Sequence, residues 1–313
     1  MMTKVEKQNK ILFYIKGYSR QFLPKQNLEK KINALRTTLS KSDLDVAEYR
    51  VDYYNKLSEK QKVTHSGTRI KDLKHPKTPK SYYFDTYEYA RYFDENLLID
   101  YAFGDVNTIL QIPMITKSRP IAGSNENNIL LNLDKARHFV SIEDSKSFDS
   151  KTNKLIGRAA VHQQHRIDFF NEYFKNPLCD LGQVNKSGGD QKWLKPKISI
   201  DEHLKNKFVL SLEGNDVATN LKWIMCSNSL AVTPKLKMET WYMEGILIPN
   251  EHYVQIADNY SDLEERLQYY IDHPNEAKLI IENAKEFRSK FSNKNLEDLI
   301  ALLVLKKYFD LIG

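Results

Sequence analysis

The chain has 313 residues and a mass of 36.6 kDa, about twice the commonest domain size, so we expect one large domain or two cores of roughly 150 residues each. Hydrophobic residues make up 41% of the chain and 35 residues are aromatic, which excludes a disordered protein, and the 21 glycines and prolines are too few for a collagen-like or low-complexity protein. The net charge is +6, but residues 1–80 hold 19 Lys and Arg against 8 Asp and Glu. This basic quarter is either a solvated lysine-rich face or a surface for an anionic partner, such as nucleic acid, an acidic membrane or a phosphorylated glycolipid.

In chain order, the first half is expected to be rich in helices. Residues 27–40, 43–57 and 82–93 carry apolar side chains at helical spacing. Residues 97–103 form a short apolar strand candidate that ends at Gly104-Asp105, where a carboxylate suits a general base, although a lone aspartate in a turn is usually a turn residue. The polar stretch 145–154 is predicted to be an interdomain linker.

The second half alternates between strand and helix patterns, which is typical of a parallel sheet. The expected strands are 154–161, 180–184, 207–212 and 230–233, and the expected helices are 165–174, 217–227, 261–291 and 296–311, with a flexible loop at 186–197. Asn295 is the predicted N-cap of the last helix. The turn Glu213–Asp216 would place a helix amino terminus where a phosphate is favoured, unless Asp216 only caps that helix.

Three further groups of residues could carry chemistry. Arg158 and Arg166 stand at a strand-to-helix junction, where they either grip a diphosphate or lie on the surface. His162 and His165 lack a third ligand, so a capping or solvated pair is favoured over a metal site. The aromatic stretch 241–253 could stack on a nucleobase or lie in the core. The glycine-rich patterns of dinucleotide-binding proteins and of P-loops are missing from the sequence.

The cysteines and the apolar runs bear on the compartment. Cys179 and Cys226 can form at most one disulfide, and the sequence has no zinc-type Cys/His spacing, so we expect a reducing environment. The apolar runs at 11–15 and 299–305 are too short for a signal peptide or a membrane span. The sequence therefore predicts a soluble protein of the cytoplasm.

Several segments together resemble glycosyltransferase family 90. They are, in order, YYFDTYEYARYF, FGDV followed by TKSRPI, HRIDFFNEYF, KFVLSLEGNDVATNLKW and ETWYMEGILIPNEHYVQI. The similarity runs from about Tyr82 to Phe291 and is greatest to the bacterial enzymes that add a hexose to the lipopolysaccharide inner core. The family also includes Rumi-type protein O-glucosyltransferases and fungal capsule xylosyltransferases.

The resemblance implies an α/β fold of the GT-B type, with two Rossmann-like domains facing a cleft and a helix-rich N-terminal part. It implies an acceptor-binding domain at 1–152, a nucleotide-sugar-binding domain at 153–286 and a C-terminal helix at 287–313 that returns to the first domain. The implied partners are a UDP-sugar, the lipopolysaccharide core and, through peripheral contact, the inner face of the inner membrane.

The resemblance further implies an inverting transfer of a hexose from UDP-glucose or UDP-galactose to lipopolysaccharide or lipooligosaccharide, without a cofactor or metal ion. Asp105 takes the place of the family's base. The implied donor-binding residues are Arg158, Arg166, Gly214, Asn215, Asp216, Ala218, Thr219, Asn220 and Lys222. This chain has Gly157-Arg158 where arginine-glycine is usual, and it lacks the serine and arginine that eukaryotic relatives carry near Asn220, so the helix amino terminus and Lys222 should hold more of the phosphate.

Other functions stay open at this point. The chain could be a transferase of the same family acting on another glycan or on a protein, or a relative that binds without catalysis. A basic nucleic-acid-binding protein is the alternative from a different class. It is disfavoured because no RNA- or DNA-binding module is recognisable and the basic surplus lies outside the strand–helix–strand region.

Overall fold

The computed structural model describes residues 4–7, 9–24, 26–61, 67–74 and 80–312. The fold is mixed α/β, as predicted, and it divides into two compact units. The sheet unit comprises residues 140–236 and 245–289 together with the N-terminal strand, and the helical unit comprises residues 7–139, 237–244 and 290–313. The GT-B arrangement implied by the resemblance stays a prediction.

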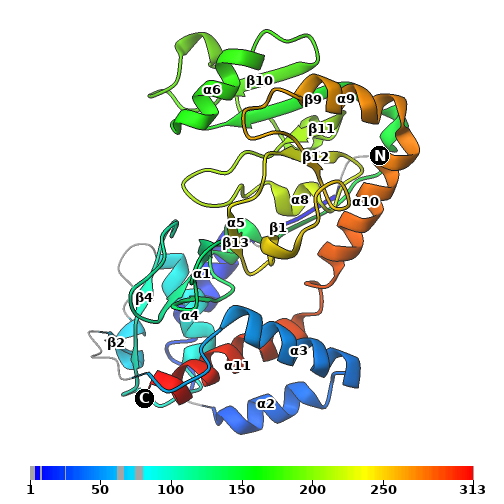
Figure 1. Ribbon diagram of the computed structural model, residues 1–313. Helices are drawn as coiled ribbons and strands as arrows, with labels where there is room; N and C mark the ends of the chain where they lie inside the picture. The colour runs from blue at the N-terminus through cyan, green and yellow to red at the C-terminus, as the bar shows by residue number, and fades with distance from the viewer. Residues whose placement is uncertain (1–3, 8, 25, 62–66, 75–79, 313) are drawn as a thin grey trace. The chain divides into compact units, whose positions relative to one another are not determined.

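The sheet unit is built on a five-stranded sheet whose strands all run parallel. Its spatial order is β10-β9-β11-β12-β14, which Figure 1 shows in part. The strands are β9 (Thr152–Ala159), β10 (Cys179–Gln183), β11 (Asn206–Leu210), β12 (Leu230–Thr233) and β14 (Val254–Gln255). The predicted parallel sheet is therefore confirmed, with four strands within two residues of the expected bounds, whereas β14 was not predicted.

The chain order of this sheet reverses between its two central strands. From β9 the chain passes through α6 (Gln164–Tyr173) to β10 on one side, whereas from β11 it passes through α8 (Leu221–Ile224) to β12 on the other side. The loops that leave β9 and β11 therefore diverge. In open parallel sheets this point of divergence leaves a crevice at the carboxyl ends of the strands, where ligands bind.

Fully buried aliphatic and aromatic side chains hold the sheet to its covering helices. The core joins residues from all five strands with residues of α6, of α9 (Leu263–Asp272) and of α10 (Pro274–Ser289). The single helix predicted at 261–291 is instead two helices that meet at His273-Pro274, because proline cannot donate the hydrogen bond that would continue α9.

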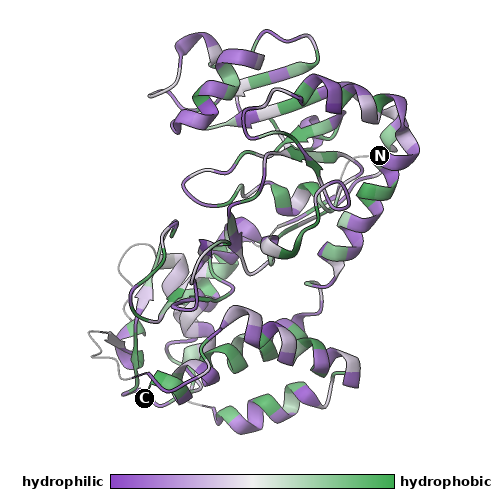
Figure 2. Ribbon diagram, viewed as in Figure 1, coloured by the Kyte–Doolittle hydropathy of each residue, from purple (hydrophilic) through white to green (hydrophobic). Residues whose placement is uncertain are grey.

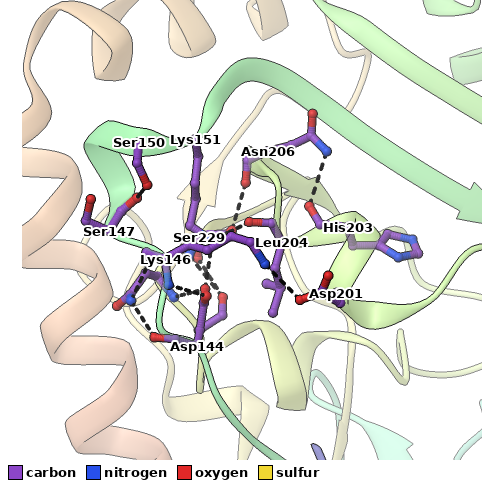
Figure 3. A network of polar contacts seen from close by, with 12 residues as sticks. Asp144, Lys146, Ser147, Ser150, Lys151, Asp201, His203, Leu204, Asn206 and Ser229 are labelled. Atoms are coloured by element: carbon purple, nitrogen blue, oxygen red, sulfur yellow. Dashed lines mark hydrogen bonds and ion pairs between the residues drawn. The ribbon is translucent and has the colours of Figure 1, made fainter. Parts of the chain in front are cut away.

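A buried ion pair closes the amino-terminal edge of the same sheet (Figure 3). The Lys151 ammonium, just before β9, donates to Asp144 Oδ2 at 2.7 Å, to the Leu204 carbonyl at 2.6 Å and to Ser229 Oγ at 3.0 Å. Both charged side chains are fully buried. Phe148 lies in the core of the unit, so the stretch 145–154 is not the linker predicted from its polarity, and the chain changes unit between Phe139 and Val140.

The described residues of the helical unit form six α-helices and three small sheets. Its parallel sheet, β4-β5-β7, has only three short strands, and α11 runs beside α3. In Figure 2 hydrophilic and hydrophobic residues alternate along α2 and α3, as expected for helices with one buried face. The helices are α1 (Lys10–Ser19), α2 (Leu28–Arg36), α3 (Lys41–Tyr54), α4 (Lys80–Ala90), α5 (Lys135–His138) and α11 (Lys294–Ile312). The strands are β2 (Thr68–Arg69), β3 (Leu98–Ile99), β4 (Tyr101–Ala102), β5 (Met114–Thr116), β6 (Ser118–Pro120), β7 (Asn128–Leu130) and β13 (Met238–Thr240).

The remaining elements are short. In the sheet unit β1 pairs with β8, and α7 precedes β11. Their bounds are β1 (Lys4–Lys7), β8 (Val140–Glu143) and α7 (Ile200–His203). The 3-10 helices are η1 (Ile70–Lys74), η2 (Phe148–Ser150), η3 (Gln191–Trp193) and η4 (Glu244–Ile246).

A buried charged cluster joins three separate stretches of the chain in the helical unit. Arg50 of α3 donates to Glu297 of α11, with its Nη2 3.0 Å from Oε2, and the indole N–H of Trp241 donates to the same carboxylate. Tyr54 stacks on Trp241 at a centroid distance of 4.0 Å. The first N–H groups of α11 donate to the Asn293 side chain, so Asn293 and not Asn295 is the N-cap.

Candidate active site

A cavity of about 350 Å³ lies at the crevice where the loops from β9 and β11 diverge. Its walls come from the end of β9, the first turn of α6, α7, the end of β11 and the loop that leads into α8. The lining residues are Gly157, Arg158, Ala159, Ala160, Arg166, Ile200, His203, Leu210, Leu212, Ala218, Thr219, Asn220 and Trp223. The structure thus brings together five of the nine predicted donor-binding residues.

Arg166 holds the two diverging loops together. In the loop after β9, the Ala160 carbonyl accepts from Arg166 Nη1 at 2.8 Å. In the loop after β11, the Leu212 carbonyl accepts from Nη2 at 2.7 Å and the Glu213 carbonyl accepts from Nε at 3.0 Å. Among the described residues no carboxylate lies within ion-pair distance of this guanidinium. Burial lowers the pKa of Arg166, yet an arginine stays charged at neutral pH. The cavity therefore borders a half-buried positive charge that the protein does not neutralise.

Arg158 lines the same cavity but is already paired. Its Nη2 donates to both carboxylate oxygens of Asp180, at 3.0 and 3.1 Å, and its Nη1 donates to the Asp180 carbonyl at 2.8 Å. Lys195 donates to the same carboxylate at 2.8 Å. Burial alone would raise the pKa of Asp180, but the bonds from Lys195 and Arg158 lower it, so the carboxylate is charged and neutralises much of the Arg158 charge.

The loop before α8 offers further donors. Asn220 fixes this loop to the end of β11, because its Nδ2 donates to the Leu210 carbonyl at 2.8 Å and its Oδ1 lies 3.2 Å from Ser211 Oγ. Within the described part of the chain, the main-chain N–H groups of Ala218, Thr219 and Asn220 and the Thr219 hydroxyl donate no hydrogen bond. Such groups beside a cavity suit an anionic oxygen.

The other predicted donor residues do not line this cavity. A Cβ built on Gly214 would lie 3.3 Å from Arg166 Nη2, so the missing side chain lets the loop approach that guanidinium. Asn215 is exposed and accepts from the Gln163 side chain at 2.9 Å. Asp216 and Lys222 are buried.

The predicted helix amino terminus beside Gly214–Asp216 is wrong. Only Leu221–Ile224 is helical in this stretch, so Asp216 neither begins nor caps a helix. The apolar residues Val217 and Ala218, which suggested a helical face, are instead buried within the loop. A helix of one turn has almost no aligned dipole, so any phosphate held here would depend on Arg166 and on individual loop donors.

His203 and Trp223 add an aromatic wall that the sequence analysis missed. Their rings meet edge to face, with centroids 5.7 Å apart. Burial lowers the pKa of His203, so its ring is neutral at pH 7, and its Nδ1 lies 2.8 Å from the Ser199 carbonyl. No local pattern in the sequence marks these two residues as neighbours, because α7 and α8 lie on either side of β11 in the chain.

The structure does not place His162 and His165 as a pair of metal ligands. His165 Nε2 lies 2.8 Å from the Glu213 carbonyl, and His162 is exposed. Among the described residues no cluster of three His, Cys, Asp or Glu is arranged to hold a metal ion. Both cysteines are free thiols.

Asp105, the predicted base, belongs to the helical unit. It follows β4 after Gly104, whose φ of +121° an L-residue rarely adopts. Lys117, almost fully buried, donates to Asp105 Oδ1 at 2.7 Å, while the Asp105 side chain is 32% exposed. The hydrogen bond from Lys117 orients the carboxylate, and about a third of the Asp105 side chain remains exposed.

A larger open groove of about 950 Å³ lies elsewhere in the helical unit, between α3 and α11. Two of its four cations are paired, with Lys307 2.7 Å from Asp52 and Lys306 2.7 Å from Asp310. It also has the carboxylates of Glu48, Asp52 and Asp310 in its lining, and it does not lie at the diverging loops of a parallel sheet, so we do not assign a site to it.

Comparison with known proteins finds a family model and a curated relative that are similar to this chain. The model of glycosyl transferase family 90 matches residues 158–312. A curated relative, the O-glucosyltransferase LpsA of Dichelobacter nodosus, is 40% identical over 316 aligned residues, which cover 100% of this chain and 99% of the relative. In the part of the chain that the structure describes, no helix is long and apolar enough to cross a membrane.

Proposed function

Because the chain belongs to glycosyl transferase family 90, we propose that it moves glucose from UDP-glucose to a sugar of the lipopolysaccharide inner core, with inversion at the anomeric carbon. Glucose as the donor sugar is supported by the name of the Dichelobacter nodosus relative. The observation that carries the proposal furthest is the unneutralised Arg166 guanidinium beside the cavity at the crevice of the parallel sheet.

We propose that UDP occupies this cavity. Arg166 and the N–H and hydroxyl groups of Ala218 and Thr219 would receive the diphosphate, since a charge-assisted bond to a phosphate is about twice as strong as a neutral one. The wall made by His203 and Trp223 suits a flat uracil ring, which stacks on aromatic faces. The sugar would then lie toward the open mouth of the cavity.

The proposed reaction is one displacement with Asp105 as the general base. The acceptor hydroxyl gives its proton to the Asp105 carboxylate while its oxygen forms a bond to the anomeric carbon and the bond from that carbon to the UDP oxygen breaks. Lys117 holds the Asp105 carboxylate in place through its hydrogen bond to Oδ1, and a general base acts in its ionised form. Positioned general-base catalysis contributes roughly 10²- to 10⁴-fold to the rate.

UDP leaves with an additional negative charge, which has to be stabilised as it develops. Arg166 can do this because its position is fixed by three carbonyls before the substrate arrives, so no reorganisation is needed during the reaction. We therefore propose that the reaction proceeds without a metal ion.

The test is a donor and acceptor panel with the full-length chain. UDP release would be followed for several UDP-sugars with truncated lipooligosaccharides, and the anomeric configuration of the product would be read by NMR. We expect turnover with UDP-glucose and a β-linked product. Turnover only on another glycan or on a protein would favour the alternative acceptors, and an α-linked product would exclude the single displacement.

A further inference from the structure

The N-terminal helix α1 is apolar on two opposite faces. Phe13 and Gly17 face inward against Phe84 of α4, and a Cβ on Gly17 would lie 2.6 Å from the Phe84 ring, so α1 is seated tightly. On the other side, Ile11 and Ile15 are 72% and 57% exposed. A helix that is hydrophobic all round is normally covered all round.

The exposed apolar surface continues into the turn that follows α1. Phe22 is 85% exposed, the most of any large hydrophobic residue in the described chain, and Leu23 beside it is 53% exposed. Of the sixteen large hydrophobic residues exposed in the described chain, seven lie within residues 11–23. We call these seven the apolar face, namely Ile11, Leu12, Tyr14, Ile15, Tyr18, Phe22 and Leu23. A concentration of exposed apolar side chains in one short segment is typical of an interaction site.

The segment that carries the apolar face has only positive charges of its own, of which Arg20 is paired with Glu88 of α4. Five Lys and Arg and no Asp or Glu occur between Glu6 and Glu29. Lys10 and Lys16 are exposed, and no described carboxylate lies within ion-pair distance of either. At 100° per residue the two lysines fall on opposite flanks of the stripe formed by Ile11 and Ile15. This surface is complementary to a plane that is apolar inside and anionic at its rim.

Two tyrosines stand at the border of the apolar face. Tyr14 and Tyr18 are 38% and 43% exposed and lie edge to face against Phe84, with centroids 5.9 and 4.9 Å away. Tyrosine is enriched at the level of lipid headgroups, where its ring is apolar and its hydroxyl stays wet. The contacts with Phe84 hold both rings in place before any partner binds.

We propose that the apolar face docks on an anionic lipid bilayer, with Phe22, Leu23 and Ile15 entering the headgroup–acyl boundary and Lys10 and Lys16 contacting lipid phosphates. Apolar insertion and electrostatic attraction act together in such contacts, and either one alone binds only weakly. Binding to the bilayer does not require the proposed function. Only the role of this binding rests on it, which is to bring the enzyme to a membrane-anchored acceptor.

The experiment is vesicle cosedimentation of the full-length chain. Vesicles of phosphatidylcholine alone are compared with vesicles that also contain phosphatidylglycerol. We expect binding to the anionic vesicles only. Ile15→Ser with Phe22→Ser should weaken it by at least about tenfold. Lys10→Gln with Lys16→Gln should weaken it about fivefold per lysine and reduce its salt dependence. Leu279→Ser, at a site 56% exposed on α10, is the matched control and should bind like the parent.

Three outcomes overturn the proposal. They are equal binding to neutral vesicles, parent-like binding by the Ile15/Phe22 variant, and sedimentation velocity showing a dimer that only this variant loses, which would make the face a contact between two copies. Turnover on a soluble deacylated acceptor is measured separately and should be unchanged in the surface variants. If the parent itself lacks that turnover, the proposed function fails while the vesicle result still decides the docking.

Discussion

Replacing Arg166 with alanine is the sharpest test of the donor site. A hydrogen bond to a charged group contributes about 1.5 to 3 kcal/mol, so loss of the bond to the diphosphate should weaken UDP binding by roughly 10- to 150-fold. UDP and UDP-glucose should lose affinity equally, because the contact is to the part they share. Isothermal calorimetry measures both affinities.

The structure also sets a stability cost for the same change. Arg166 donates to three carbonyls at 2.7 to 3.0 Å, and even at the net 0.5 to 1.5 kcal/mol of an ordinary hydrogen bond their loss should reduce the free energy of unfolding by about 1.5 to 4.5 kcal/mol. Urea denaturation measures this and shows whether the variant is folded at the temperature of the binding assay. Arg166→Lys keeps the charge, so it should recover part of the UDP affinity while remaining less stable than the parent.

Arg158 provides the internal comparison. Its charge is already neutralised by Asp180, so Arg158→Ala should weaken UDP binding by less than about threefold, as should the surface control Arg266→Ala. The reasoning is refuted if folded Arg166→Ala binds UDP like the parent, or if Arg158→Ala loses more affinity than Arg166→Ala.

Further predictions concern the reaction and the stability of both units. Asp105→Asn should lower kcat by roughly 10²-fold or more with unchanged UDP-glucose affinity, and near-parental turnover would remove Asp105 from the role of base. Activity should persist in excess EDTA, and a loss that Mn²⁺ restores would contradict charge stabilisation by Arg166 alone. Burial raises the pKa of Asp85 to about 7, above its unfolded value of about 3.9. Between these two values the folded chain keeps a proton that the unfolded chain loses. The contribution of this proton to the free energy of unfolding is therefore complete below about pH 4 and declines as the pH rises to about 7. Asp85→Asn should therefore flatten the fall of unfolding free energy over that range in urea titrations, and parallel pH profiles would exclude this. Lys151→Met leaves the buried Asp144 carboxylate without its cation and should lower the free energy of unfolding, measured with denaturant, by about 3 to 5 kcal/mol. Lys154→Met, at an exposed position, should change the same free energy by less than about 0.5 kcal/mol.

The parallel sheet could be predicted from sequence because two of its central strands, β11 and β12, are short and buried along their whole length. β11 and β12 fall where apolar runs of four to six residues were expected, since side chains buried on both faces leave no alternation to misread. Predictions based on polarity failed. Lys151 and its neighbours suggested a linker, but a fully bonded ion pair lets such residues lie in the interior.

The sequence identified several residues of the candidate site, but it did not predict which residues they contact. Arg166 and the loop to Asn220 were named from the sequence, and the structure places both around one cavity. The sequence could not show that Asp180 neutralises Arg158, because that pairing depends on the register between β9 and β10. The sequence also could not show that residues 217–220 form a loop and not a helix, because the apolar Val217, which is buried in the loop, fits the apolar spacing of a helix.

The cluster of Arg50, Trp241 and Glu297 constrains how this protein can be made. It draws on three stretches of the helical unit that are far apart in the chain, the last of them within the C-terminal helix. During synthesis the sheet unit has all its residues once Ser289 emerges, whereas the unit that begins near the N-terminus waits for α11. Domains usually fold in the order of their synthesis. Here the order of completion is reversed, so a ribosome that stalls before α11 would leave the N-terminal helices with an open core and exposed to aggregation or proteolysis.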